Sequence, residues 1–182
     1  MILETDRLIL RPLEDRDRAA FVAMNADAEV MRFFAATKTE AESLVQFDSF
    51  AARDRELGYS FNAAELKADG SFVGVIGLSP IGAELKAVLR GAPFAEIGWR
   101  FCRRFWGRGL APEGARAWLA FAWKELGLDE VVALTFRGNL PSQRVMEKIG
   151  MARDPDGDFA HPGVPEANPV RPHVLYRIDR PA

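Results

Sequence analysis

The chain has little of what marks a secreted or membrane-spanning protein. Cys102 is the only cysteine among 182 residues, which excludes an internal disulfide framework and a multi-cysteine zinc site. No apolar run approaches the roughly 20 residues that a membrane-spanning helix needs. The first residues, MILETDRLILRP, lack a basic stretch followed by an apolar one, so we expect no signal peptide. A single cysteine suits a reducing compartment, and we expect a cytoplasmic protein with no membrane partner.

The chain also lacks a strong net charge of either sign. Its 24 basic and 26 acidic residues give a formal charge of -2, so nothing global points to a nucleic-acid partner. Between residues 100 and 116, however, the only acid is Glu113, beside Arg100, Arg103, Arg104, Arg108 and Arg116. A local basic cluster on a mildly acidic chain favours a discrete anionic ligand over a long polyanion.

Length and periodicity are typical of one mixed α/β domain that spans residues 1–182. The chain is 48% hydrophobic and 27% charged, and it is long enough to bury a sizeable core. Alternating or continuous apolar runs predict strands, and apolar residues at helical spacing predict helices. Glycines follow three of the helices, and Asp69-Gly70 predicts a hairpin. The strands are expected at 4–11, 59–66, 71–78, 94–101, 130–136 and 174–178, and the helices at 14–25, 39–57, 110–126 and 140–149.

Two proline-containing segments are expected to be irregular. One is the connection over residues 79–93. The other, 155–172, holds five prolines and is predicted to form a long ordered loop, with His161 inside it and His173 just beyond. Two histidines twelve residues apart are more often structural than metal ligands. Long ordered loops also commonly contact substrates, so both interpretations stay open.

The segment RRFWGRGLAPEG, residues 103–114, can be interpreted as an anion-binding turn. The start of a helix leaves backbone N–H groups free and adds partial positive charge. Gly107 and Gly109 let the backbone approach a phosphate, and Arg104 and Arg108 can add charge-assisted contacts. The alternative is a tight turn flanked by solvated arginines. The segment is not a P-loop, and Pro112 stands where a dinucleotide fingerprint needs its third glycine.

A second segment, NLPSQRVMEKIGM at residues 139–151, gives the first one a context. Arg104-x-x-Gly107-x-Gly109 matches the phosphate motif Gln/Arg-x-x-Gly-x-Gly/Ala of the GNAT superfamily of acyl-CoA-dependent N-acyltransferases. The opening ETDRLILRPL, the EIGW at 96–99, the WGxGxA at 106–111 and the 139–151 segment resemble the RimJ/RimL-type branch, which contains ribosomal-protein N-terminal acetyltransferases. Met151 replaces a phenylalanine of that branch.

The resemblance implies a mixed α/β fold with a mostly antiparallel sheet, a splayed central strand pair and flanking helices. It implies acetyl-CoA as the acyl donor, an amine as the acceptor, no metal, and direct attack of the neutral amine on the thioester. Dimers are common in this branch, so a homodimer is compatible with it. The cofactor-binding residues that it implies are Trp99, Phe101, Arg104, Phe105, Trp106, Gly107, Arg108, Gly109, Leu110, Ala111, Asn139 and Ser142.

This chemistry needs a base and an acid. An alkylamine with a pKa of about 10 is mostly protonated at pH 7, so a group or a water molecule must accept its proton. Glu96 is the first candidate and Glu65 the second; the alternative for Glu96 is a solvated charge or an ion pair with an arginine. Many family members protonate the departing thiolate with a tyrosine where Met146 stands here. The resemblance makes Ser142 the substitute, against the alternative that it only caps its helix.

The leading interpretation is therefore an N-acetyltransferase whose acceptor is a protein N-terminus or a small-molecule amine. A catalytically degenerate acyl-CoA-binding sensor is the alternative, because the usual tyrosine is missing. A nucleic-acid-binding protein is disfavoured, since the chain lacks an extended basic stripe. Cys102 is expected to be a small buried residue and not a nucleophile, because no histidine lies nearby in the sequence.

Overall fold

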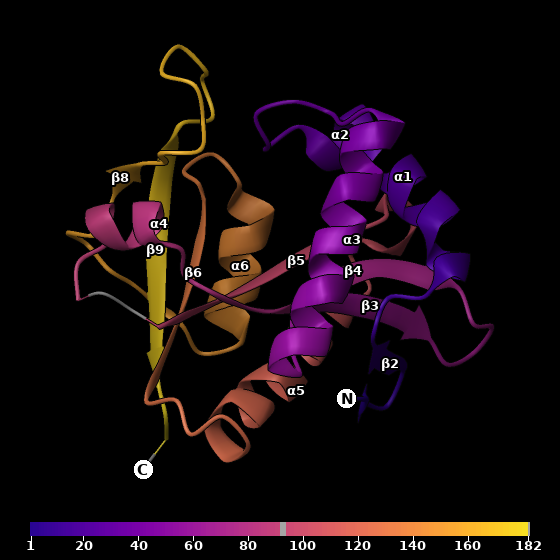
Figure 1. The fold of residues 1–182 in the computed structure, drawn as a ribbon. Helices are drawn as coiled ribbons and strands as arrows, with labels where there is room; N and C mark the ends of the chain where they lie inside the picture. Colours follow the sequence, from indigo (N-terminus) through magenta and orange to yellow (C-terminus); the bar gives the residue numbers. More distant parts are fainter. Residues whose placement is uncertain (92–93, 182) are drawn as a thin grey trace.

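A sheet of nine strands forms the centre of the protein in the computed structural model, which describes residues 1–91 and 94–181 (Figure 1). Strands from both ends of the chain share this sheet, in the order β1-β2-β3-β4-β5-β6-β9-β7, and β8 pairs with β9. The strands are β1 (Leu3–Glu4), β2 (Leu8–Arg11), β3 (Phe61–Leu66), β4 (Phe72–Pro80), β5 (Ala95–Phe101), β6 (Glu130–Phe136), β7 (Ala152–Arg153), β8 (Phe159–Ala160) and β9 (Pro172–Asp179).

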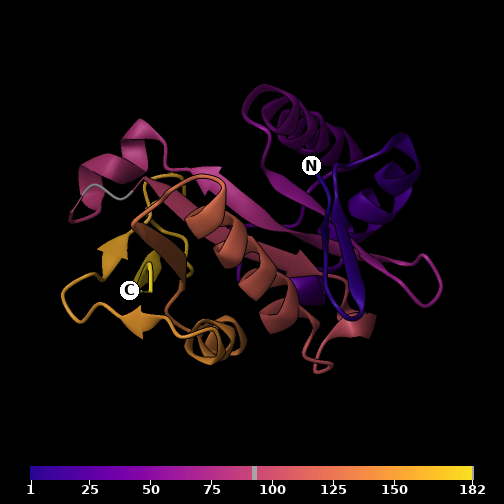
Figure 2. The ribbon, with the colours of Figure 1, turned by 90° about the horizontal axis from the view of Figure 1, so that it is seen from below.

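Helices cover both faces of the sheet. Seen from below, the purple α3 lies on one side of β4 and β5, and the orange α5 lies on the other (Figure 2). Each face has its own apolar core, one around Phe21 and Phe47 under α1 and α3, the other around Trp118 of α5. The helices are α1 (Arg18–Ala26), α2 (Ala28–Met31), α3 (Glu40–Leu57), α4 (Ala83–Val88), α5 (Leu110–Lys124) and α6 (Leu140–Lys148). The expected mixed α/β architecture is confirmed.

The central strands β5 and β6 are parallel and diverge. β5 pairs with β4 along its whole length, and β6 pairs with β9 along its whole length. Between β5 and β6, by contrast, the pairing joins only Glu96 to Val132. In Figure 1, β3 and β4 run across the view while β6 and β9 run up it. The sheet therefore opens toward the carboxyl ends of β5 and β6, at Phe101 and Phe136.

Local signals in the sequence account for the helix ends near this opening. Asn139 caps α6 by accepting a hydrogen bond from the Ser142 N–H, and Pro141 lies in its first turn, where a proline needs no partner. α5 follows Gly109 directly and carries Pro112 in its first turn. Gly58, with φ of 79°, ends α3 in the left-handed conformation that favours glycine.

Four expectations need correction. The segment 155–172 is not wholly a loop, since β8 lies inside it and β9 begins at Pro172. The strand expected at 4–11 is split into β1 and β2, because the Thr5 hydroxyl accepts a hydrogen bond from the Leu8 N–H and closes a turn. The segment 14–25 begins as a 3-10 turn over Asp15–Asp17 before α1. The segment 79–93 is not wholly irregular, since β4 extends to Pro80 and α4 follows; positions 92 and 93 lie outside the described residues. No helix of the described ranges is long and apolar enough to cross a bilayer.

Candidate functional site

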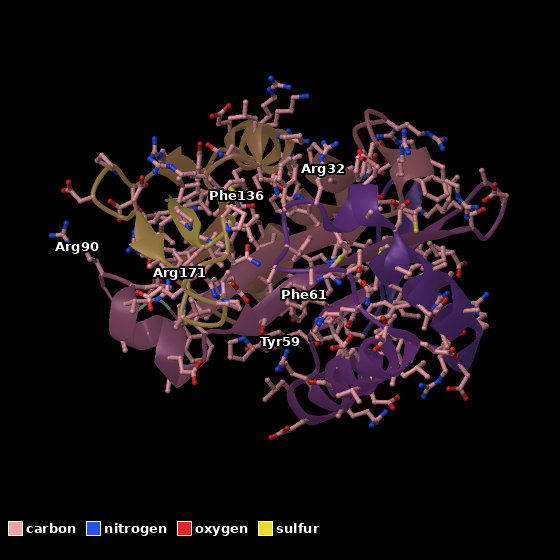
Figure 3. The ribbon with its side chains drawn as sticks, turned by 90° about the horizontal axis from the view of Figure 1, so that it is seen from above. Arg32, Tyr59, Phe61, Arg90, Phe136 and Arg171 are labelled. Atoms are coloured by element: carbon pink, nitrogen blue, oxygen red, sulfur yellow. The ribbon has the colours of Figure 1, made fainter. Side chains whose placement is uncertain are left out.

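A cleft of about 840 Å³ occupies the opening between β5 and β6. Its wall comes from β5, the glycine turn before α5, the first turns of α6, the segment 30–38 and the loop that holds His161. Three labelled wall residues, Phe61, Phe136 and Arg32, come from β3, β6 and the end of α2 in the view from above (Figure 3). The segment 30–38 was not expected here, because its apolar residues follow neither a helical nor a strand period.

The glycine turn presents free backbone N–H groups at one end of the cleft. Gly107 and Gly109 have φ of 72° and 75°, which only glycine adopts without strain. Among the described residues, none accepts a hydrogen bond from the N–H groups of residues 107–111. An added Cβ at Gly107 would meet no atom within 4 Å, so a ligand can come close to the backbone. The donors and the helix start of α5 fit a pyrophosphate group.

The arginines of this turn lie elsewhere than expected. Arg104 and Arg108 are exposed, lie outside the cleft wall, and place their guanidinium carbons 4.8 and 5.6 Å from the centre of the Phe105 ring. The cation beside Gly109 is Arg7, whose Nη1 donates to the Arg108 carbonyl oxygen at 2.8 Å. Glu113 of α5 holds Arg7 by an ion pair. The sequence signal for Arg7 was its place in the opening ETDRLILRPL, which was interpreted as part of a strand and of the family resemblance, with no role for Arg7 itself.

The other expected cofactor residues line the cleft. These are Trp99, Phe101, Phe105, Trp106, Leu110, Ala111, Asn139 and Ser142. The indole Nε1 of Trp106 donates to the Phe101 carbonyl oxygen at 2.8 Å, which ties the turn to the end of β5. The edge of β5 beyond Glu96 faces the opening without a β6 partner, so its backbone is free to pair with an extended ligand.

Asn139 and Ser142 form a small network at the start of α6. The Asn139 side-chain amide donates to Thr135 Oγ1 at 2.9 Å and to Ser142 Oγ at 3.0 Å. Both of its donor hydrogens are used, so Asn139 acts as a cap and as a support for Ser142. Because Ser142 Oγ accepts this bond, its own hydroxyl hydrogen is free to donate into the cleft.

No tyrosine of the described residues lines the cleft. Met146, where a tyrosine is usual, is 2% exposed and lies in the wall. Tyr59 is buried elsewhere, and the Tyr176 hydroxyl bonds to Gln143 and Glu147 on the outer side of α6. Ser142 is thus the hydroxyl donor of this wall that is nearest in the chain to the usual position.

Glu96 lies at the point where β5 and β6 separate, half-buried in the cleft wall. No described basic group lies within ion-pair distance of its carboxylate. Burial raises the pKa of Glu96 to about 7, an effect that the positive charge of Arg53 opposes only in part. A carboxylate with a pKa near neutrality is suited to accept a proton at physiological pH.

Glu65, the second base candidate, lies outside the cleft wall. Its carboxylate accepts hydrogen bonds from Arg11 Nε and Nη2 at 2.9 and 2.7 Å, and Arg16 is 3.0 Å away. Arg11 also donates to both oxygens of the buried Asp17. The network joins β2, β3 and the turn before α1, so the structure gives Glu65 a role in stability.

We expect Glu65→Gln to destabilise the fold by about 3 kcal/mol, because it leaves part of the buried Arg11 charge uncompensated. Urea unfolding measures this change. A matched variant, Glu56→Gln, removes an exposed carboxylate of α3 and should change the stability by less than about 0.5 kcal/mol. Equal unfolding midpoints for the two variants would contradict the structural role of Glu65.

His161 and His173 meet at the loop side of the cleft. Their rings lie 4.7 Å apart, each near Phe159, and both line the wall. Burial lowers the pKa of both, that of His173 to about 4, so both rings are neutral at pH 7. Across 1–91 and 94–181, no three His, Cys, Asp or Glu side chains group as metal ligands do. Cys102 is half-buried outside the wall, and burial raises the pKa of its thiol.

Comparisons with known proteins agree with this geometry. Residues 7–152 match a family described as "Acetyltransferase (GNAT) domain". The chain is 37% identical over 150 residues to the uncharacterized protein YkkB of Bacillus subtilis (strain 168), covering 82% of this chain and 84% of that protein. It is 33% identical over 151 residues to the FsC-acetyl coenzyme A-N(2)-transacetylase of Aspergillus fumigatus, covering 82% and 64%.

A solved structure shares the whole fold. The GNAT-family acetyltransferase from Bacillus anthracis superimposes with a TM-score of 0.79, at 28% identity, and the match covers 98% of both chains. The mixed sheet with helices on both faces is thus the GNAT fold. Proteins of the GNAT family use acetyl-CoA as a co-substrate and an amine as the acceptor. The cleft, the glycine turn and these similarities lead to one conclusion: the chain belongs to the GNAT family of acetyltransferases.

Proposed function

We propose that the chain, as a single domain over residues 1–182, transfers an acetyl group from acetyl-CoA to a primary amine by direct attack. The observation that carries this proposal is one cleft that holds three things at once. They are a turn with free N–H groups, a carboxylate with a pKa near 7, and a serine hydroxyl free to donate. The order of the sequence motifs supports a place in the RimJ/RimL-type branch, and the single cysteine suits a cytoplasmic location.

Acetyl-CoA supplies the activated acyl group. The N–H groups of residues 107–111 would hold its pyrophosphate. Arg7 lies beside Gly109 but outside the cleft wall, and its charge is paired with Glu113. The free edge of β5 after Glu96 would hold its extended arm. The binding of Arg104 and Arg108 to phosphate stays a prediction, because both side chains point away from the wall and would have to turn toward it.

Glu96 and Ser142 have different roles in the proposed reaction, one as proton acceptor and one as hydrogen-bond donor. Glu96, deprotonated above about pH 7, accepts a proton from the incoming amine, directly or through water. Ser142 donates a hydrogen bond to the sulfur as it leaves, since its hydroxyl hydrogen is not used by Asn139. Met146 has no proton to give, so the role of the usual tyrosine passes to Ser142. These two groups favour turnover over the alternative of a degenerate sensor.

We expect Ser142→Ala to lower kcat about 10- to 100-fold, because the departing sulfur loses its donor. Its effect on stability should be about 1 kcal/mol at most, because the cap of α6 uses the Ser142 N–H and the Asn139 side chain, which both remain, and only the Asn139 bond to Ser142 Oγ is lost. Steady-state thiol release and thermal unfolding measure the two effects. A purely capping role for Ser142 predicts the opposite pattern, a lower unfolding temperature with kcat unchanged.

The proposed function is tested by thiol release from acetyl-CoA over a panel of amines. We expect release that depends on both the enzyme and an amine, with an N-acetylated product identified by mass spectrometry. Tight binding of acetyl-CoA without release for any amine would contradict this proposal and support a sensor.

A further inference from the structure

Arg100 is a half-buried cation of the cleft, with a buried Nε, and it has no acidic partner among the described residues. It follows Glu96 by four residues in β5, so both side chains lie on the same face of the sheet, the one covered by α1 and α3. Both residues line the cleft. Within the described ranges no Asp or Glu pairs with the Arg100 guanidinium, and burial lowers its pKa to about 10. An unpaired buried charge is costly, and a ligand of opposite charge would offset that cost.

The contacts of Arg100 leave one edge of its guanidinium without a hydrogen-bond partner. Nη1 donates to the neutral side chains of Asn25 and Gln46, at 2.5 and 3.1 Å. The Phe34 ring covers one plane of the group, 4.3 Å from its central carbon. Nε is buried and has no hydrogen-bond partner, and Nη2 donates to none of the described residues. Asn25 and Gln46 thus hold the side chain in place and leave its Nε–Nη2 edge free.

The corresponding guanidinium edge of another arginine, Arg11, binds a carboxylate in this protein. Arg11 donates from Nε and Nη2 to one oxygen of Glu65. A planar guanidinium edge of this kind matches a carboxylate in geometry and in charge. Phe34 is 39% exposed and belongs to a segment without helix or strand, so a ligand that binds the buried Nε requires a local shift of this segment.

Arg100 lies too far along β5 to act on the proton that Glu96 receives. Four residues of a strand span about 13 Å, and Gly98, between the two, has the Phe61 ring over it. The phosphate turn has its own donors at residues 107–111. We therefore infer that Arg100 binds a part of the acceptor that does not react.

We propose that the acceptor amine also carries a carboxylate, which the Nε–Nη2 edge of Arg100 binds while Glu96 faces the amine. This inference rests on the proposed acetyl transfer and names its substrate class. The spacing favours an amine and a carboxylate that are several bonds apart, as in an ω-amino acid or a short peptide. It disfavours polyamines, whose second cation would meet the positive charge of Arg100 in the same cleft.

The test compares acceptors that differ only in this charge. Thiol release is measured with 6-aminohexanoate and 6-aminohexanamide, and with glycylglycine and its amide. The wild-type protein should prefer each carboxylate by at least about tenfold in kcat/KM. Arg100→Gln should bring the preference close to one, and Arg100→Lys should restore it in part, because lysine keeps the charge but lacks the planar edge. The control Arg55→Gln removes an exposed charge of α3 and should keep the wild-type preference.

The ratio of kcat/KM for a carboxylate acceptor to that for its amide, measured within one variant, does not depend on the fraction of protein that is folded. The same ratio in the wild-type protein tests the proposal without any substitution. Thiol release without preference for the carboxylates overturns this inference and leaves the proposed function standing. A preference that Arg100→Gln retains also overturns it. Loss of coenzyme A binding in Arg100→Gln, measured by calorimetry, would assign Arg100 to the donor instead and equally overturn it. Absence of release with every amine overturns the proposed function itself.

Discussion

Glu96→Gln is expected to lower kcat/KM about 10²- to 10⁴-fold, the range typical of losing a general base. The amide has nearly the same size as the carboxylate, but it cannot accept the proton. Burial raises the pKa of Glu96 to about 7, so the wild-type activity should rise as the pH increases through 7, where the carboxylate becomes charged. The variant should lack that inflection, although the ionisation of the amine still affects its rate at higher pH.

The pH profile separates a base from a merely structural carboxylate. Its matched control is Glu56→Gln, an exposed carboxylate of α3, which should keep the inflection near pH 7. Coenzyme A affinity, measured by calorimetry, should be similar in Glu96→Gln and the wild type, because the carboxylate lies away from the glycine turn. If Glu96→Gln kept both its rate and its inflection, a water molecule or another group would have to be the base.

Gly109→Asp is expected to weaken coenzyme A binding at least about 100-fold. Gly109 has φ of 75°, a conformation that costs other residues about 1–2 kcal/mol. The new side chain would begin 3.5 Å from Arg7 Nη2, and its carboxylate would repel a phosphate. Isothermal titration calorimetry with coenzyme A measures the loss.

Gly127→Asp is the control for backbone strain alone. Gly127 also has a positive φ, 63°, and an added Cβ there meets nothing within 4 Å, but it follows the far end of α5. This variant should lose stability and keep the coenzyme A affinity of its folded fraction. Equal affinity in Gly109→Asp and the wild type would show that the turn does not hold the pyrophosphate.

Much of the fold could be predicted from local signals. The helix at 140–149 was predicted to within one residue of α6, because Asn139 and Pro141 mark its start and Gly150 its end. The strand at 130–136 matches β6, since a continuous apolar run indicates burial on both faces. The first strand was predicted wrongly as one element, because the Thr5 side chain closes a turn within it.

The candidate site likewise combines local features that the sequence predicts with features that depend on the fold. The glycine turn and the Asn139 cap are local features that could be predicted from the sequence, and the structure brings both to the cleft wall. Their binding of the cofactor stays a prediction. Glu96 could be named as a candidate, but its raised pKa follows from burial at the point where β5 pairs with both β4 and β6, which no window of sequence contains. Glu65 could be set aside only after the fold brought Arg11 against it across β2 and β3.

The environment of Arg100 could not be predicted from the sequence. In the chain it is one of five arginines between residues 100 and 116, with nothing to separate it from Arg104 or Arg108. The strand period turns its side chain toward α1 and α3, while the other two stay in solvent at the turn. By itself the sequence determined the family motifs, the helix ends and the glycine turn, because these depend on neighbours within a few residues. Only the tertiary structure decided which charges are buried, paired or free, since that depends on residues brought together from distant strands and helices.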